Sequence, residues 1–148
     1  MNPTPAELQN AKHEQIDWEK KVESAKVLDV ARLEEVTDGE VEFVQELLDA
    51  FDESSTSDVN NIIKAIGSSD NKTLKLSAHS MKGACLSMGL NRAGTLCFFI
   101  EKGAEGLLEQ EVYNGLNSNV SKQLEALHEN LVSAKAAIQN YMQNVSEK

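Results

Sequence analysis

A histidine, a lysine and a glycine lie close together in the segment AHSMKGACLSMGL, which spans residues 78–90. The order is His79, two other residues, Lys82 and Gly83. Because residues three and four apart are neighbours on a helix, Lys82 and Gly83 would both lie one turn beyond the imidazole. A nucleophilic ring nitrogen flanked by an ammonium group and a bare backbone can accept a phosphoryl group and hold it briefly. The spacing therefore predicts phosphoryl chemistry at His79.

The apolar residues of this segment set the direction in which His79 points. Five of them fall within roughly 80° of one another at about 100° per residue and form a core stripe of ordinary width: Leu74, Ala78, Met81, Cys85 and Met88. His79 projects roughly 120° away from this stripe. Leu76 and Leu86 share its outward sector. We expect His79 to face solvent between Leu76 and Leu86, which we also expect to lie outside the core.

An ordinary explanation competes with this one, because a lone histidine on a helix is usually a neutral surface residue. Gly83 argues against it. A glycine inside a helix costs about 0.8–1 kcal/mol relative to alanine, so its place one turn from an outward histidine needs a reason. Room for a bulky group on the imidazole would be such a reason.

The segment resembles the histidine phosphotransfer (HPt) domain family, whose signature is histidine, two residues, Lys-Gly and then small residues ending in Gly-Ala or Gly-Leu. The resemblance covers residues 27–142 and is most specific between His79 and Gly89. HSMKG through GLNRAG is most similar to the stand-alone fungal phosphorelay intermediates. The resemblance implies that His79 is the phosphoacceptor, that Lys82 stabilises the phosphoryl oxygens and that Gly83 gives steric room.

Two positions depart from the family pattern. Ser-Ser or Ser-Ala commonly follows Lys-Gly, whereas this chain has Ala84 and Cys85, which are also small. A glutamine of the next helix often approaches the imidazole, and Glu101 takes this place by residue count. We expect Glu101 to accept a hydrogen bond from the ring nitrogen that is not attacked. A surface ion pair is the alternative role for this glutamate.

The resemblance also implies the partners, which are receiver domains. The chain would take the phosphoryl group from the receiver aspartate of a hybrid sensor kinase and pass it to the aspartate of a response regulator. The receiver would supply Mg²⁺, so the chain would need no cofactor of its own. The predicted docking contacts around the site are Leu76, Leu86, Leu28 and Lys75. No glycine-rich phosphate loop or ATP motif is present in the sequence, so we expect a carrier and not an ATP-dependent enzyme. A helical adaptor without chemistry and a small phosphohistidine phosphatase remain alternatives.

Charge is distributed unevenly along the chain. The net charge is -10, which disfavours binding to the phosphates of nucleic acids. Between Lys64 and Lys102, six basic and two acidic residues give +4, which leaves -14 for the rest of the chain. A basic island around His79 would attract the acidic mouth of a receiver domain. The alternative is that these side chains only cover exposed helix positions.

Composition limits the remaining possibilities. A chain of 148 residues with 41% apolar residues is about one domain and needs no metal or disulfide to fold. No apolar run approaches the about 18 residues that span a bilayer, and the N-terminus does not resemble a signal peptide. Cys85 and Cys97 lack metal-ligand spacing, and neither His13 nor His128 has a second ligand nearby. We expect a monomer with no metal, no nucleic acid and no membrane partner, in the cytoplasm and also in the nucleus.

Helical periodicity predicts the elements that position the segment. We expect residues 1–24 to be a leader, helical over residues 6–24 and anchored by Trp18 or else partly disordered. We expect residues 25–148 to form the bundle domain. The expected helices there span residues 27–36, 41–66, 70–88, 91–106 and 112–145. Asp38 is predicted to cap the second of these, Ser69 or Asp70 the third, and Gly89 to end the third. Gly103 and Gly106 are predicted to end the fourth. The pattern predicts an all-α protein, an up-down-up-down four-helix bundle with additional helix at the N-terminal end.

Overall fold

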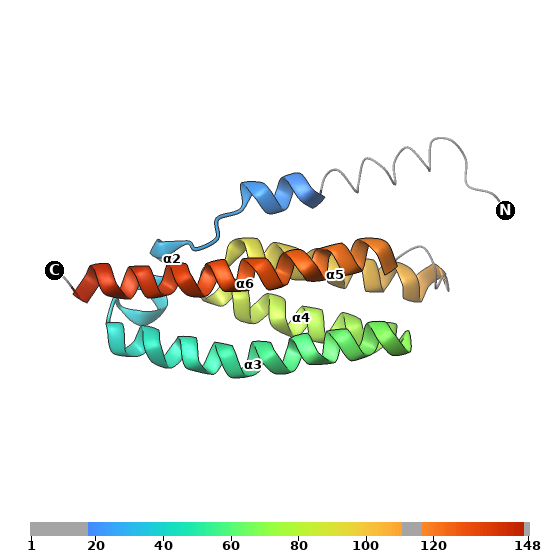
Figure 1. The fold of residues 1–148 in the computed structure, drawn as a ribbon, viewed down its shortest axis with the longest axis horizontal. Coiled ribbons are helices and arrows are strands. Elements are labelled where there is room, and N and C mark those ends of the chain that lie inside the picture. Colours follow the sequence, from blue (N-terminus) through green and yellow to red (C-terminus); the bar gives the residue numbers. More distant parts are fainter. Residues whose placement is uncertain (1–17, 111–116, 147–148) are drawn as a thin grey trace.

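The computed structural model describes residues 18–110 and 117–146, and these residues contain helices and no strands (Figure 1). The helices are α2 (Val30–Thr37), α3 (Val41–Ser68), α4 (Asn71–Ser87), α5 (Asn91–Gln110) and α6 (Asn117–Ser146). Residues 18–24 are helical as well. The predicted all-α class is confirmed.

The four long helices α3 to α6 lie lengthwise beside one another (Figure 1). Each of them packs against the next in the chain, and α3 also contacts α6, which closes the bundle. Short turns join α3 to α4 and α4 to α5, so these neighbours run in opposite directions. The helix of residues 18–24 and α2 precede this bundle, as the sequence predicted for its N-terminal end.

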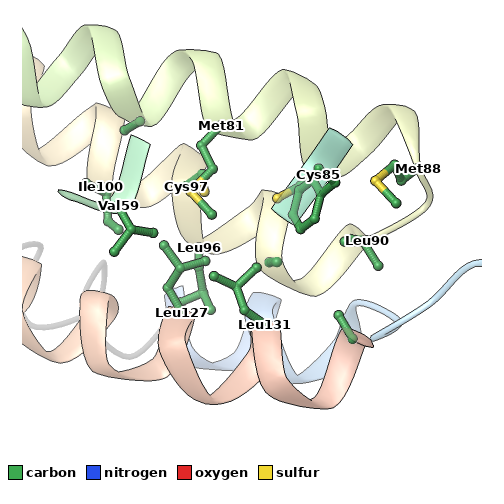
Figure 2. Close-up of a cluster of buried hydrophobic side chains, with 14 of the residues drawn as sticks. Val59, Met81, Cys85, Met88, Leu90, Leu96, Cys97, Ile100, Leu127 and Leu131 are labelled. Carbon is green, nitrogen blue, oxygen red and sulfur yellow. The ribbon is translucent and has the colours of Figure 1, made fainter. Parts of the chain in front are cut away.

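The core of the bundle contains the whole stripe predicted for α4. Its five members are buried: Leu74, Ala78, Met81, Cys85 and Met88. Figure 2 shows part of this cluster, in which Met81 and Cys85 lie among Leu96, Cys97 and Ile100 of α5 and Leu127 and Leu131 of α6. Burial of apolar surface is the main force that fixes how a helix is rotated about its axis. Burial of the stripe therefore leaves His79, which projects away from it, at the surface.

The segment before α3 differs from the prediction. The helix predicted for residues 27–36 is α2, and it begins at Val30 and not at residue 27. The Asp29 side chain caps α2 at this point by accepting a hydrogen bond from the Arg32 backbone N–H at 3.4 Å. Asp38 does not cap α3. It ends α2 in the left-handed conformation, at a φ of 54°, which aspartate tolerates better than most residues. The N-cap of α3 is Glu40, without a side-chain cap bond, so the prediction for Asp38 was wrong.

The polar residues 53–57 do not interrupt α3, which agrees with the single helix predicted over residues 41–66. The hydroxyls of Ser54, Ser55 and Thr56 donate to backbone carbonyls three or four residues earlier. Asp70 caps α4 by accepting from the Thr73 backbone N–H at 3.1 Å, which confirms one of the two predicted caps.

The end predicted for α5 was wrong, because α5 continues to Gln110 and contains Gly103 and Gly106. An interior glycine costs only about 1 kcal/mol. The packing of α5 between α4 and α6, with Ala104 fully buried, outweighs that cost. The predicted helical positions from residues 6 to 17, and from 112 to 116, lie outside the described residues, as does His13.

The turn between α4 and α5 forms hydrogen bonds with residues 23–29, which lie at and after the end of the helix of residues 18–24. The Asp29 N–H donates to the Gly89 carbonyl at 2.7 Å, and the Arg92 N–H donates to the Lys26 carbonyl at 2.8 Å. The Arg92 guanidinium donates to the carbonyls of Glu23 and Ala25, each at 2.9 Å. These bonds fix the C-terminal end of the helix of residues 18–24 against the antiparallel pair of helices α4 and α5.

The helix of residues 18–24 is anchored by Trp18 as predicted, because Trp18 is buried in the core cluster together with Val22. A division of the chain at residue 24 stays a prediction.

Gly89 should be difficult to replace. Its φ is +86°, and a Cβ there would lie 2.6 Å from the Asp29 carbonyl oxygen. We expect Gly89→Ala to lower the free energy of unfolding by about 2–4 kcal/mol, from backbone strain and from crowding. Urea denaturation measures this difference. Gly67→Ala, where a Cβ in α3 meets open space, is the matched control and should be neutral or stabilising. Equal stability of the two variants would contradict the role assigned to the turn.

Candidate functional site

His79 lies in the middle of α4 on the side that faces α5. Its side chain is 66% exposed, while Ala78 beside it is fully buried. The predicted outward direction of the imidazole is therefore confirmed. A rigid helix in a packed bundle holds the ring at the surface.

The helices α4 and α5 meet in an antiparallel register with one contact in each turn. Leu86 lies against Gly94, and Lys82 lies near the ring of Phe98. His79 contacts Glu101, and Lys75 contacts Glu105. Each step of three or four residues along α4 corresponds to a similar step backwards along α5. This register brings a carboxylate next to His79.

Glu101 is the residue that fixes the imidazole. Its two carboxylate oxygens lie 3.0 and 2.9 Å from Nδ1 of His79, and Lys82 Nζ donates to the same oxygens at 3.0 and 3.3 Å. An ionised carboxylate only accepts hydrogen bonds, so Nδ1 must carry a proton. In the neutral ring, Nε2 then keeps its lone pair. The arrangement leaves one nucleophilic nitrogen on an exposed ring.

The carboxylate is ionised at neutral pH. Glu101 is only 4% exposed, and this burial would by itself raise its pKa. The hydrogen bonds from His79 and Lys82, with the positive charge of Lys82, outweigh burial and hold the pKa of Glu101 below its ordinary value. The predicted contact between Glu101 and the imidazole is confirmed. The same geometry shows that Lys82 and His79 share one buried acceptor, which residue counting did not predict.

Gly83 borders open space. It is exposed, and a Cβ built on it would meet no atom within 4 Å. The backbone of α4 is therefore bare one turn beyond His79. Such room is what a phosphoryl group or a docking partner would need beside the ring.

The predicted docking residues lie in two places. Leu76 and Leu86 are exposed on α4 on either side of His79. Leu86 can lie close to α5 because a Cβ on Gly94 would come within 2.5 Å of its Cδ2. Leu28 is partly buried against the core. It lines a groove with Ala137 and other residues of α6, not with the α4 and α5 residues around His79.

The basic island is more closely balanced by acidic groups than the sequence count indicated. Lys75 lies 3.6 Å from Glu105, and Lys102 donates to the same carboxylate at 3.0 Å. Lys82 is bound to Glu101, and Arg92 is engaged with backbone carbonyls. Glu105 lies just beyond the stretch that was counted, so its charge did not enter the count. The local positive excess around His79 is therefore smaller than +4.

Sequence reasoning did not identify Phe98. This residue of α5 is 37% exposed, and its ring centroid lies 5.7 Å from Lys82 Nζ and 5.6 Å from Lys102 Nζ. Its position three residues before Glu101, on the same face of α5, was the available signal. The exposed ring of Phe98 therefore lies next to Lys82, which shares the Glu101 carboxylate with His79.

The other titratable groups show no further centre. In the two described stretches, no group of three or more histidine, cysteine, aspartate or glutamate residues could hold a metal ion. Cys85 and Cys97 are free and buried in the core, and the neighbouring Cys85 thiol together with burial raises the pKa of Cys97. Buried thiols of this kind are inert. His128 is exposed on α6 and lines a groove between α3 and α6. No helix within the described part of the chain has the length and apolar character to cross a membrane.

A family model described as Hpt domain matches residues 46–146, more than half of the chain. The matched stretch contains His79, Lys82, Gly83 and Glu101. Neither a curated protein nor a solved structure matches the chain at a significant level. The closer similarity to stand-alone fungal intermediates stays a prediction.

Proposed function

Because the chain belongs to the Hpt domain family, whose members are phosphotransfer carriers of two-component systems and interact with receiver domains, we propose that His79 is its phosphoacceptor. The group would come from the aspartate of one receiver domain, that of a hybrid sensor kinase, and would go to the aspartate of a response regulator. The observation that carries the proposal is the bond between Nδ1 of His79 and the buried Glu101, on a ring that is otherwise exposed.

This bond determines which nitrogen reacts. The lone pair of Nε2 attacks the phosphorus of the aspartyl phosphate, a P–N bond forms, and the P–O bond to the aspartate breaks. The carboxylate leaves with the electron pair of that bond. The imidazole becomes positively charged and keeps its proton on Nδ1, opposite the negative charge of Glu101. The same proton makes neutral imidazole the leaving group when the phosphoryl group moves on, so the step runs in both directions.

Charge stabilisation is the second requirement, because phosphoryl transfer depends mainly on positioning and electrostatics. Lys82 shares the Glu101 carboxylate with the imidazole. It would exchange one bond to Glu101 for a bond to a phosphoryl oxygen. The receiver domain would supply Mg²⁺ at its own acidic site.

Docking would use the surface around His79. Leu76 and Leu86 give apolar contacts on both sides of the ring, and Lys75 and Lys82 give positive charge. A receiver domain with carboxylates at its active site and an apolar rim would fit this arrangement. Leu28 stays a predicted contact for a partner large enough to reach the groove near α6.

Gly83→Gln tests the need for open space. Glutamine is a good helix former, and a Cβ at this position meets nothing, so the bundle should fold normally. The longer side chain should crowd Nε2 and lower the rate of transfer from a phosphorylated receiver by at least about tenfold. Gly67→Gln on α3 is the matched control, since its Cβ also meets open space. Unchanged transfer in Gly83→Gln would remove this glycine from the site.

The decisive experiment mixes the protein with a receiver domain that carries radiolabelled phosphate on its aspartate. We expect one labelled group per chain, stable in alkali and labile in acid, as a phosphohistidine is, and its return to a second receiver domain. Binding without label would support an adaptor. Release of inorganic phosphate over many turnovers would support a phosphatase. Either result would overturn the proposal.

A further inference from the structure

We propose that Phe98 is a positioning residue for Lys82, and that its ring keeps the Lys82 ammonium beside His79 during phosphoryl transfer. This inference rests on the proposed function. Its basis is the position of Lys82 Nζ, 5.7 Å from the Phe98 centroid and 3.0 Å from the Glu101 carboxylate. The lysine side chain is 21% exposed. It is therefore held at two points, one charged and one aromatic.

The two contacts have different consequences once a phosphoryl group arrives. The hydrogen bonds to Glu101 hold the ammonium in one direction, and they weaken as the ammonium turns towards the phosphoryl oxygens. The face of an aromatic ring attracts a cation over its whole area and does not require one fixed geometry. Contact with Phe98 can therefore persist while Lys82 moves. A flexible lysine that loses its only partner would otherwise regain much of its rotational freedom.

The ring is itself held in place. Phe98 meets Phe99 edge to face, with centroids 5.3 Å apart and an interplanar angle of 78°, and Phe99 packs against the core. Lys102 Nζ lies 5.6 Å from the same centroid, but Glu105 binds this ammonium at 3.0 Å. Glu105 thus gives Lys102 a carboxylate partner of its own, separate from the one that Lys82 shares with His79. The arrangement leaves Lys82 as the cation shared between Phe98 and the acceptor of His79.

A competing role for Phe98 is that of an exposed apolar contact for the receiver domain. The two roles separate when the phosphoryl donor is a small molecule that has no surface to dock. Phosphoramidate is such a donor. In this reaction a new P–N bond forms to Nε2 of His79 and the P–N bond of phosphoramidate breaks, and the leaving nitrogen takes up a proton from water and departs as ammonia. A positioning role predicts a defect with this donor, whereas a docking role predicts none.

The test compares Phe98→Leu with Phe98→Tyr in the full chain. Leucine keeps apolar bulk and removes the aromatic face, while tyrosine keeps the face. We expect Phe98→Leu to slow phosphorylation by phosphoramidate, measured by ³¹P NMR, by about two- to fivefold. Phe98→Tyr should remain near the unaltered rate. In a Lys82→Met background, Phe98→Leu should have no further effect, because the cation it positions is gone.

Several outcomes would overturn the inference. A rate equal to that of the unaltered chain with phosphoramidate, together with slower transfer from a receiver domain, would make Phe98 a docking contact. An undiminished effect in the Lys82→Met background would show that the ring acts without the lysine. If the unaltered chain formed no phosphohistidine with either donor, the proposed function itself would fail, and the positioning role would fail with it. Circular dichroism and urea denaturation check that each variant is folded.

Discussion

A His79→Gln variant should accept no phosphoryl group from a phosphorylated receiver domain, whereas the unaltered chain should carry one per molecule. The amide of glutamine has no nitrogen lone pair that can attack phosphorus, although its size is similar to that of imidazole. The side chain at this position is 66% exposed, so the substitution should hardly affect folding. Glu101 would keep its bond to Lys82. The loss of acceptance would therefore be a loss of chemistry and not of structure.

His128→Gln is the matched control for this variant. His128 is also an exposed histidine on a long helix, but neither Glu101 nor Lys82 contacts it in the described structure. It should accept label at the unaltered rate. Acid-labile, alkali-stable label on His79→Gln would place the acceptor at another residue. Label lost from both variants would point to a shared structural defect, which denaturation curves would reveal.

The outward direction of His79 could be predicted because it depends on one helix alone. The 3.6-residue period fixes which side chains of α4 share a face, and the stripe from Leu74 to Met88 is buried as expected. The proximity of Glu101 followed from residue count across a short turn, since Gly89 ends α4 and Asn91 begins α5. Local periodicity and one tight turn were sufficient for both results.

Contacts that depend on the packing of two helices could not be predicted in the same way. Phe98 reaches Lys82 only because α4 and α5 approach closely where Leu86 lies against Gly94. The pairing of Lys75 with Glu105 depends on the same register. A count of charges along the chain does not show which acidic residues of α5 lie next to the basic residues of α4. It therefore overestimated the positive charge around His79.

Predictions of helix ends from single residues were also wrong where the residue type is common in two kinds of local structure. Aspartate is favoured at N-caps, yet it also tolerates the left-handed conformation, and Asp38 takes the second role at the end of α2. Glycine is favoured after helix ends, but Gly103 and Gly106 lie inside α5. For the two glycines, the packing of α5 between α4 and α6 decides the outcome.

Replacement of Glu101 should have the second largest effect on transfer. In Glu101→Leu the imidazole loses the acceptor that fixes its tautomer, and Lys82 loses its carboxylate partner. We expect transfer from a receiver domain to slow by about 10- to 100-fold, the range typical of a misplaced reacting group. Glu101→Gln keeps an acceptor for Nδ1–H without the charge and should be intermediate. Glu105→Gln, which alters a carboxylate that binds Lys75 and Lys102 but not His79, should transfer at nearly the unaltered rate.

The charge of Glu101 can be tested separately through stability. Its pKa is lowered below the ordinary value of 4.5, so the folded state favours the ionised form. The stabilisation by the ionised group is complete above about pH 4.5 and is lost as pH falls through the lowered pKa. Urea denaturation of the unaltered chain and of Glu101→Gln should differ by about 1–2 kcal/mol near pH 7, and the difference should shrink in acid. A constant difference down to pH 3 would mean that hydrogen-bond geometry, and not charge, holds Glu101 to His79 and Lys82.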